Sequence, residues 1–145
     1  MKPIITWIVL ADAKTMRIAV NEGPGKGLYG RKTEGVEPAP VTALSDAPGM
    51  TNAPMGPNRG GISDPDLKGQ AEAAFASDIV SYLAGAMRNG EFDRLVLVAA
   101  PEMLGLLRER LSTPLQEVLR ADLPKDLTHV TLDDLPKHLE DVMVV

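Results

Sequence analysis

The chain has no cysteine and only two histidines, and its aromatic residues are limited to two tyrosines, two phenylalanines and one tryptophan. Without cysteine it can form no disulfide, thiol nucleophile, iron–sulfur cluster or thiolate zinc site. The two histidines, His129 and His138, do not form a close pair, so we expect no metal site and no cofactor. So few aromatic residues also provide no stacking platform for single-stranded RNA.

Long apolar runs are missing as well. No segment approaches the roughly 18 apolar residues of a membrane span, and the apolar run near the N-terminus is followed by no cleavage site. Twenty acidic residues outnumber 15 basic ones, which gives a net charge of −5 and disfavours binding of nucleic acid. We therefore expect a cytoplasmic protein, with no membrane partner, whose 145 residues form one domain.

The first third of the chain predicts a hairpin and then a long loop. Residues 4–11 are nearly all apolar, as in a strand covered on both faces, and residues 16–20 alternate in polarity. The short break between them predicts an antiparallel pair. Residues 23–66 hold 9 of the 13 glycines and 7 of the 12 prolines, which predicts an irregular loop at about 23–64 with one short strand at 36–44.

The remainder alternates between helices and strands. Asp64 and Pro65 predict the start of a helix with apolar residues every fourth position, and Gly90 its end. A continuous apolar run at 95–100 predicts a central parallel strand, and the leucine within it, Leu97, should be fully buried.

Two further helices and a strand are expected next. Pro101 opens one helix, and Thr113 to Gln116 form a capping box for a second that runs to about Arg120. A strand at 127–130 follows, and Thr131 caps the last helix.

This order of elements predicts the fold class α/β: a ribonuclease H-like mixed sheet with an antiparallel N-terminal hairpin and helices on the sheet faces. A doubly wound Rossmann-like sheet is the alternative, but no glycine-rich fingerprint follows the first strand.

Four runs carry a resemblance to a known family: WIVLADAKTMRIAVNEGPGKGL (7–28), LSDAPG (44–49), FDRLVLVAAPEMLGLLRERL (92–111) and KDLTH (125–129). Together they resemble the family of small proteobacterial proteins required for attachment to host cells. That family is more distantly similar to the middle domain of the archaeal and eukaryotic class-1 release factors, which implies a ribonuclease H-like fold.

The resemblance implies binding residues in the central segment. Where the family has Asp-Arg-Pro-Gly-Arg, this chain keeps Asp46 and Gly49 but has alanine and methionine in place of the two arginines. The loss of two guanidinium groups weakens any anion site there, and Arg59 compensates in part. We expect residues 46–62 to form an interaction surface, because flexible methionines in such a loop adapt to a partner.

Release factors use a Gly-Gly-Gln loop before a long helix, and Lys68-Gly69-Gln70 lies in the comparable place. Lysine restricts the backbone where glycine is free, and the helix should already have begun. Gln70 is therefore a candidate binding residue on a solvent-facing helix rather than a catalytic one.

A metal-dependent nuclease needs several carboxylates around its ions. Asp12 ends the first strand, Glu72 lies on the long helix, and Asp133 and Asp134 precede the last helix, but no carboxylate follows Ala99. We expect no catalytic residue, and we interpret Asp12 as a turn residue that binds nearby backbone amides.

The KDLTH run supplies the last candidates, Lys125, Asp126 and His129, which can bind a ligand at the sheet edge; a histidine satisfied by local hydrogen bonds is the simpler interpretation. The predicted function is a non-enzymatic interaction domain with an unknown protein partner or a second copy. The alternative is an RNA- or ribosome-associated factor. A contiguous basic face would favour that alternative, made of Lys14, Lys26, Arg31, Lys32 and Arg59.

Overall fold

The computed structural model describes the backbone of residues 3–31, 57–143 and 145, and the side chains of the same residues except 57–66. The strand expected at 36–44 and the first part of the expected surface 46–62 lie outside the described residues.

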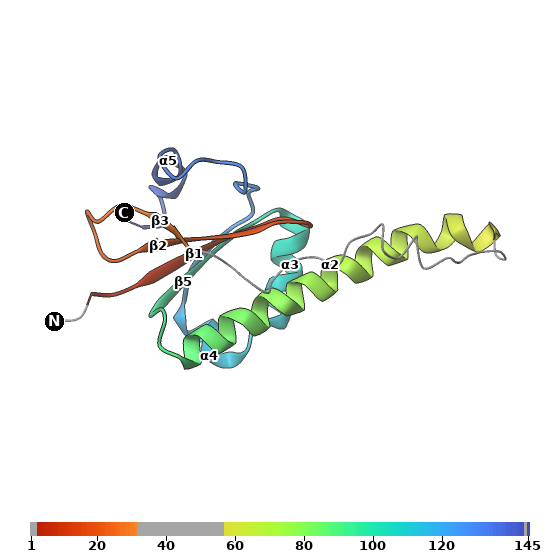
Figure 1. The fold of residues 1–145 in the computed structure, drawn as a ribbon, viewed down its shortest axis with the longest axis horizontal. Coiled ribbons are helices and arrows are strands. Elements are labelled where there is room, and N and C mark those ends of the chain that lie inside the picture. The colour runs from red at the N-terminus through yellow and green to blue at the C-terminus, as the bar shows by residue number, and fades with distance from the viewer. Residues whose placement is uncertain (1–2, 32–56, 144) are drawn as a thin grey trace.

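A five-stranded mixed sheet forms the centre of the molecule (Figure 1). Its strands are β1 (Thr6–Ala11), β2 (Met16–Asn21), β3 (Tyr29–Arg31), β5 (Arg94–Ala99) and β6 (Leu119–Leu123). The order across the sheet is β3-β2-β1-β5-β6. The pairs β3/β2 and β2/β1 are antiparallel, whereas β5 and β6 run parallel to β1. The predicted mixed α/β class and N-terminal hairpin are confirmed.

Helices cover one face of this sheet. They are α2 (Pro57–Arg88), α3 (Pro101–Arg110) and α4 (Thr113–Val118), all on the same side in Figure 1. Alternate residues of β1 and β5, including Trp7, Val9 and Leu97, point into this layer and are at most 1% exposed. Leu97 is fully buried, as predicted. Trp7 packs against Phe92 with ring centroids 4.7 Å apart.

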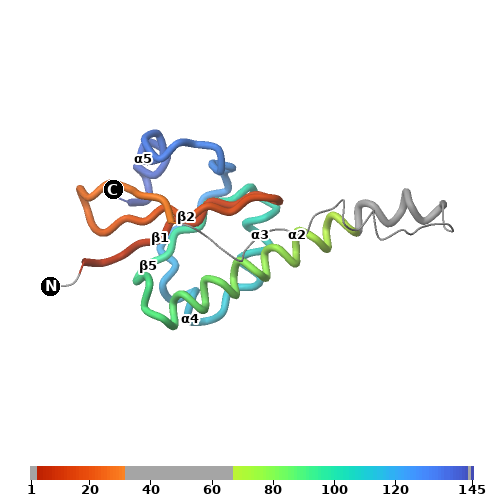
Figure 2. Tube along the Cα trace, in the orientation of Figure 1, coloured from red at the N-terminus to blue at the C-terminus, as the bar shows by residue number. Residues whose placement is uncertain are grey.

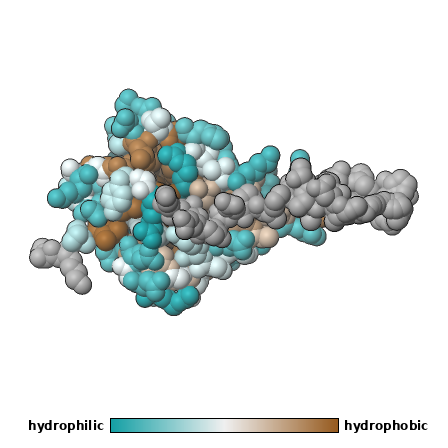
Figure 3. Space-filling view, in the orientation of Figure 1, coloured by the Kyte–Doolittle hydropathy of each residue, from teal (hydrophilic) through white to brown (hydrophobic). Residues whose placement is uncertain are grey.

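The other face is covered by the C-terminal segment, which includes the short helix α5 (Leu135–Leu139). The opposite set of strand residues points there, and this second core contains Ile8, Leu10 and Val98 from the strands. Leu135 and Leu139 pack onto them and are fully buried. The tube in Figure 2 follows this segment across the sheet, and Figure 3 shows apolar, brown atoms around it.

Local signals determine where α2 ends. The N–H of Gly90 donates to the carbonyl of Met87 at 3.0 Å, and the N–H of Glu91 donates to that of Ala86 at 3.0 Å. This paired bonding requires a left-handed residue after the helix, and Gly90 adopts it with φ +72°. The predicted end of the helix is confirmed.

The beginning of α2 differs from the prediction. The helix begins at Pro57 rather than after an N-cap at Asp64, so Pro65 lies inside it. Pro57, like Pro65, fits the first turn of a helix, where the missing N–H costs nothing. The sequence alone does not decide which of these two prolines, eight residues apart, marks the start of the helix.

The strand predicted at 127–130 is wrong. Leu127 and Val130 are two apolar residues separated by polar ones, but the segment is a turn, in which the N–H of Val130 donates to the carbonyl of Leu127 at 3.1 Å. The last strand of the sheet is instead β6, directly after α4. Helix α4, which the sequence predicted to run to about Arg120, therefore ends at Val118, because strand β6 begins at the next residue.

Strand β6 is irregular. Leu119 is opposite Leu95 and Ala121 is opposite Val96, so Arg120 is an extra residue, a β-bulge. Strand β3, with three exposed residues, lies at the other edge, within the segment expected to be a loop.

The capping box is also wrong in detail. Ser112 is the N-cap of α4, and the side-chain amide of Gln116 donates to the carbonyl of Leu111 at 3.0 Å, whereas in a capping box its oxygen would accept from the N–H of Thr113. The prediction that Thr131 caps the last helix is wrong too: the N-cap of α5 is Asp134, and the Thr131 hydroxyl accepts from the N–H of Asp134 at 3.2 Å in the turn before the helix.

Candidate functional site

The candidate site starts at the turn between β1 and β2. The Oδ1 atom of Asp12 accepts hydrogen bonds from the N–H groups of Lys14 at 2.8 Å and Thr15 at 2.7 Å. The N–H of Asp12 donates to the carbonyl of Thr15 at 2.9 Å, which closes the turn. A short acidic side chain is suited to this, because it folds back onto amides two and three residues ahead. Asp12 has the turn role expected from the sequence.

The second oxygen of Asp12 connects this turn to the KDLTH run. Thr128 is 2% exposed, and its hydroxyl lies 3.0 Å from Asp12 Oδ2 and 2.7 Å from Asp126 Oδ1. A hydroxyl has one proton, so the two carboxylates share it. The N–H of Thr128 also donates to Asp126 Oδ1 at 3.2 Å. One buried threonine therefore joins two carboxylates that are far apart in sequence.

Arg17 completes the arrangement from β2. Its Nη1 atom donates to the carbonyls of Thr128 and Val130, both at 2.7 Å. Two backbone carbonyls that form no sheet bonds are thereby satisfied by a charged donor, the stronger kind of hydrogen bond. We call Asp12, Arg17, Asp126 and Thr128 the latch, since they attach the KDLTH turn to the β1–β2 hairpin.

Exposed basic residues lie next to the latch in the chain. Lys14, Lys125 and His129 are all exposed, and they lie on the turns that the latch holds together. The pKa of Asp126 is held below its usual value, first by the hydroxyl of Thr128, then by the N–H of the same residue, and to a smaller extent by the charge of His129. Asp126 is thus ionised at neutral pH, which suits its role as a hydrogen-bond acceptor.

The structure brings four of the sequence candidates together: Asp12, Lys125, Asp126 and His129. Gln70 lies apart from them, exposed on α2.

The other candidates cannot be placed. Asp46 and Gly49 lie outside the described residues, and of Arg59 only the helical backbone is described.

Two important residues of the latch were not predicted. Thr128 had a usable signal, because Asp-x-Thr is a turn sequence whose side chains bond locally. Arg17 had none, since its partners are 111 and 113 residues away.

Residues that a nuclease would use do not converge on Asp12. Strand β5 ends at Ala99 and is followed by Ala100 and Pro101, and Asp133 and Asp134 are exposed in the turn before α5. Among the residues that the structure describes, no three histidine or carboxylate side chains are placed to hold a metal ion.

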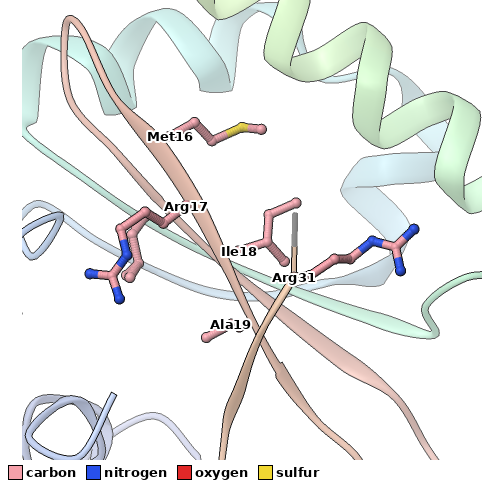
Figure 4. A pocket seen from close by; sticks show the side chains of 7 residues that line it. Met16, Arg17, Ile18, Ala19 and Arg31 are labelled. Atoms are coloured by element: carbon pink, nitrogen blue, oxygen red, sulfur yellow. The ribbon is translucent and has the colours of Figure 1, made fainter. Parts of the chain in front are cut away.

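A pocket of about 190 Å³ lies at the edge of β2, where β3 ends (Figure 4). Arg17 and Arg31 both line it, but they extend to opposite sides of the sheet. Arg31 is positioned over the Trp7 ring, 4.7 Å from its centroid, and pairs with Glu91. The two guanidinium groups therefore do not form one anion site.

The basic face considered for RNA is also divided. Lys14 precedes β2 and Lys26 follows it, so the six residues of that strand separate them by roughly 20 Å. Lys32 and the side chain of Arg59 lie outside the described part of the chain.

A comparison with protein families matches residues 7–139 to the family described as "Protein required for attachment to host cells". The chain belongs to this host-attachment family. The match extends from β1 to α5 and thus includes the whole latch. A search of curated proteins gave no match to this member of the host-attachment family.

Within the described residues of this host-attachment protein, every helix is too short or too polar to cross a membrane.

Proposed function

We propose that this host-attachment protein is a non-enzymatic, cytoplasmic interaction domain that binds a protein partner through a rim of basic residues beside its latch, Lys14, Lys125 and His129. The observation that carries the proposal is the engagement of Asp12. Both of its oxygens accept hydrogen bonds from the protein itself, two from backbone amides and one from the Thr128 hydroxyl. A carboxylate used in this way holds a turn, and the engagement of both oxygens favours a structural role over that of a metal ligand.

The sheet supports a ribonuclease H-like architecture for this domain. Three antiparallel strands, β3-β2-β1, continue into two strands parallel to β1. The carboxyl ends of β1 and β5 meet at one edge, which is where open α/β sheets bind their ligands. In this chain, β1 is followed at that edge by Asp12, whose oxygens accept hydrogen bonds from the protein, and β5 ends at the apolar Ala99. This edge therefore supports binding of a partner by the surrounding surface.

The rim consists of Lys14, Lys125 and His129, presented on turns that the latch holds in place. Positions held by a built-in hydrogen-bond network can recognise a partner with little loss of conformational entropy. The two lysines of the rim, on an otherwise acidic chain, favour a partner with an acidic surface, because complementary charge accelerates encounter and fixes orientation.

The experiment compares the wild-type protein with a rim variant, Lys14→Glu with Lys125→Glu. The control, Lys68→Glu with Lys137→Glu, changes net charge equally at exposed positions on α2 and α5. Each protein is used to capture partners by cross-linking in cell extract, and each captured protein is then tested by direct titration. We expect a protein ligand with reduced affinity for the rim variant and unchanged affinity for the control.

Three outcomes would contradict the proposal. Equal affinity of the rim and control variants would place the interface elsewhere. Mg²⁺-dependent cleavage of an RNA–DNA hybrid that is abolished by Asp12→Ala would show an enzyme. If structured RNA rather than protein binds wild type and loses affinity with the rim variant, the alternative of an RNA-associated factor is correct.

A further inference from the structure

The C-terminal segment 124–143 packs on the face of the sheet opposite α2, α3 and α4, yet it forms no strand. Beneath it lie Ile8, Leu10, Val96 and Val98, all at most 1% exposed. The segment covers them with only one five-residue helix, α5, and a series of turns. A large apolar surface therefore depends on a part of the chain with little regular structure.

The backbone hydrogen bonds of this segment are local. Among the described residues, the turn and cap bonds from Leu127 to Met143 join residues of the segment to one another, as in Leu135 to Thr131 at 2.9 Å and Met143 to Leu139 at 3.0 Å. The bonds that cross to the rest of the molecule come from side chains, namely Arg17 to two carbonyls and Thr128 to Asp12. Detaching the segment breaks no bond of the sheet.

The position of the segment in the chain also matters. On the opposite face, α2 precedes β5, and α3 and α4 together connect β5 to β6, so moving any of these helices away from the sheet strains the strands next to it in the chain. No strand of the described sheet follows residue 124. Among the residues that the structure describes, the latch is therefore the polar attachment between this segment and the strands.

We propose that residues 124–143 act as a strap that opens as a unit, under the control of the latch, while the five-stranded sheet and its three helices stay folded. Opening uncovers the apolar face formed by Ile8, Leu10, Val96 and Val98. Units of this kind open with a lower free energy than global unfolding and exchange their amide hydrogens faster. This proposal does not depend on the protein partner proposed above.

Hydrogen exchange of the full chain, followed by mass spectrometry at several low urea concentrations, tests the strap in the wild-type protein. We expect amides of Leu127–Met143 to exchange through an opening with a smaller urea dependence than amides of β1 and β5. An identical urea dependence in both regions would mean that the strap opens only when the whole domain unfolds, and would overturn the proposal.

Variants test the control by the latch. Thr128→Val keeps the shape of the side chain and removes the hydroxyl, which should raise strap exchange about tenfold. Arg17→Met removes two charge-assisted bonds and should raise it about a hundredfold. Exchange in β5 should stay within about twofold in both.

The matched control is Arg108→Met. Arg108 donates two hydrogen bonds to Asp122, at 2.9 and 2.7 Å, and links α3 to β6 on the opposite face. The Arg108→Met variant should leave the exchange rates of the strap unchanged. Equal acceleration of strap and β5 in Thr128→Val, or acceleration of the strap by Arg108→Met, would refute control by the latch.

Discussion

Replacing Asp12 distinguishes a turn residue from a metal ligand. Asp12→Ala removes the acceptor of three hydrogen bonds, each of which contributes about 1.5–3 kcal/mol when the acceptor is charged. Two of the three donors have a substitute, because the Lys14 N–H is near solvent and the Thr128 hydroxyl still has Asp126. The Thr15 N–H is partly buried and loses its partner. We therefore expect the free energy of unfolding to fall by about 1.5–3 kcal/mol, the contribution of one such bond.

Asp12→Asn should behave differently. Its amide oxygen still accepts from Lys14 and Thr15, and its NH₂ group can donate to the Thr128 oxygen, whose proton then goes to Asp126. We expect a loss below about 1 kcal/mol, because all the donors stay paired.

The assay is urea unfolding followed by the fluorescence of Trp7, which is 1% exposed and is the one tryptophan of the chain. Asp133→Ala, at an exposed position outside the latch, is the control and should stay within about 0.5 kcal/mol of wild type. The reasoning is refuted if Asp12→Ala costs less than about 0.5 kcal/mol, or if the asparagine variant is as unstable as the alanine variant.

Three further changes test the fold and the latch. Leu97→Ala should lower the free energy of unfolding by about 2–5 kcal/mol in urea, because Leu97 is fully buried; a loss below about 1 kcal/mol would contradict its central position. Gly90→Ala should lower the thermal midpoint, since φ is +72° there and alanine is strained; an unchanged midpoint would exclude that strain. The pKa of Asp126 is lowered in the folded protein, so its stabilising contribution is present above the unfolded pKa near 3.8 and is lost as the pH falls below it. Urea midpoints between pH 7 and pH 3 should therefore fall less in Thr128→Val than in wild type, and an equal fall would contradict this origin of the shift.

The strands that sequence predicted well are those with strong local patterns. The apolar runs at 4–11 and 95–100 and the alternation at 16–20 appear as β1, β5 and β2. A run buried on both faces must be apolar throughout, so its composition alone is informative. The end of α2 at Gly90 could be predicted equally well, because a left-handed residue after a helix is a local requirement.

The edge strands were missed for a physical reason. Strand β3 has three exposed residues, and β6 contains Arg120 and Asp122, so neither shows an apolar pattern. An edge strand forms because its neighbour offers a row of unpaired backbone groups, and that neighbour is distant in sequence. The strand expected at 127–130 had the better apolar pattern, but a buried threonine and an aspartate bond it into a turn.

Part of the candidate site could be predicted from the sequence. Local chemistry predicts the turn role of Asp12 and the candidate residues of the KDLTH run. Their convergence could not be predicted, because Asp12 and Thr128 are 116 residues apart and meet only when β1 and β6 join the same sheet.

The bulge at Arg120 affects how readily the edge of the sheet can pair with another molecule at high protein concentration. An open sheet ends in unpaired amides and carbonyls, and a flat edge can recruit a strand from another molecule and start a fibre. At β6 the extra residue twists the backbone out of register, and Pro124, which has no N–H to donate, follows directly. This side of the sheet is therefore a poor template for an incoming strand, and the irregular residue that costs the sheet one regular pairing protects the protein from aggregation.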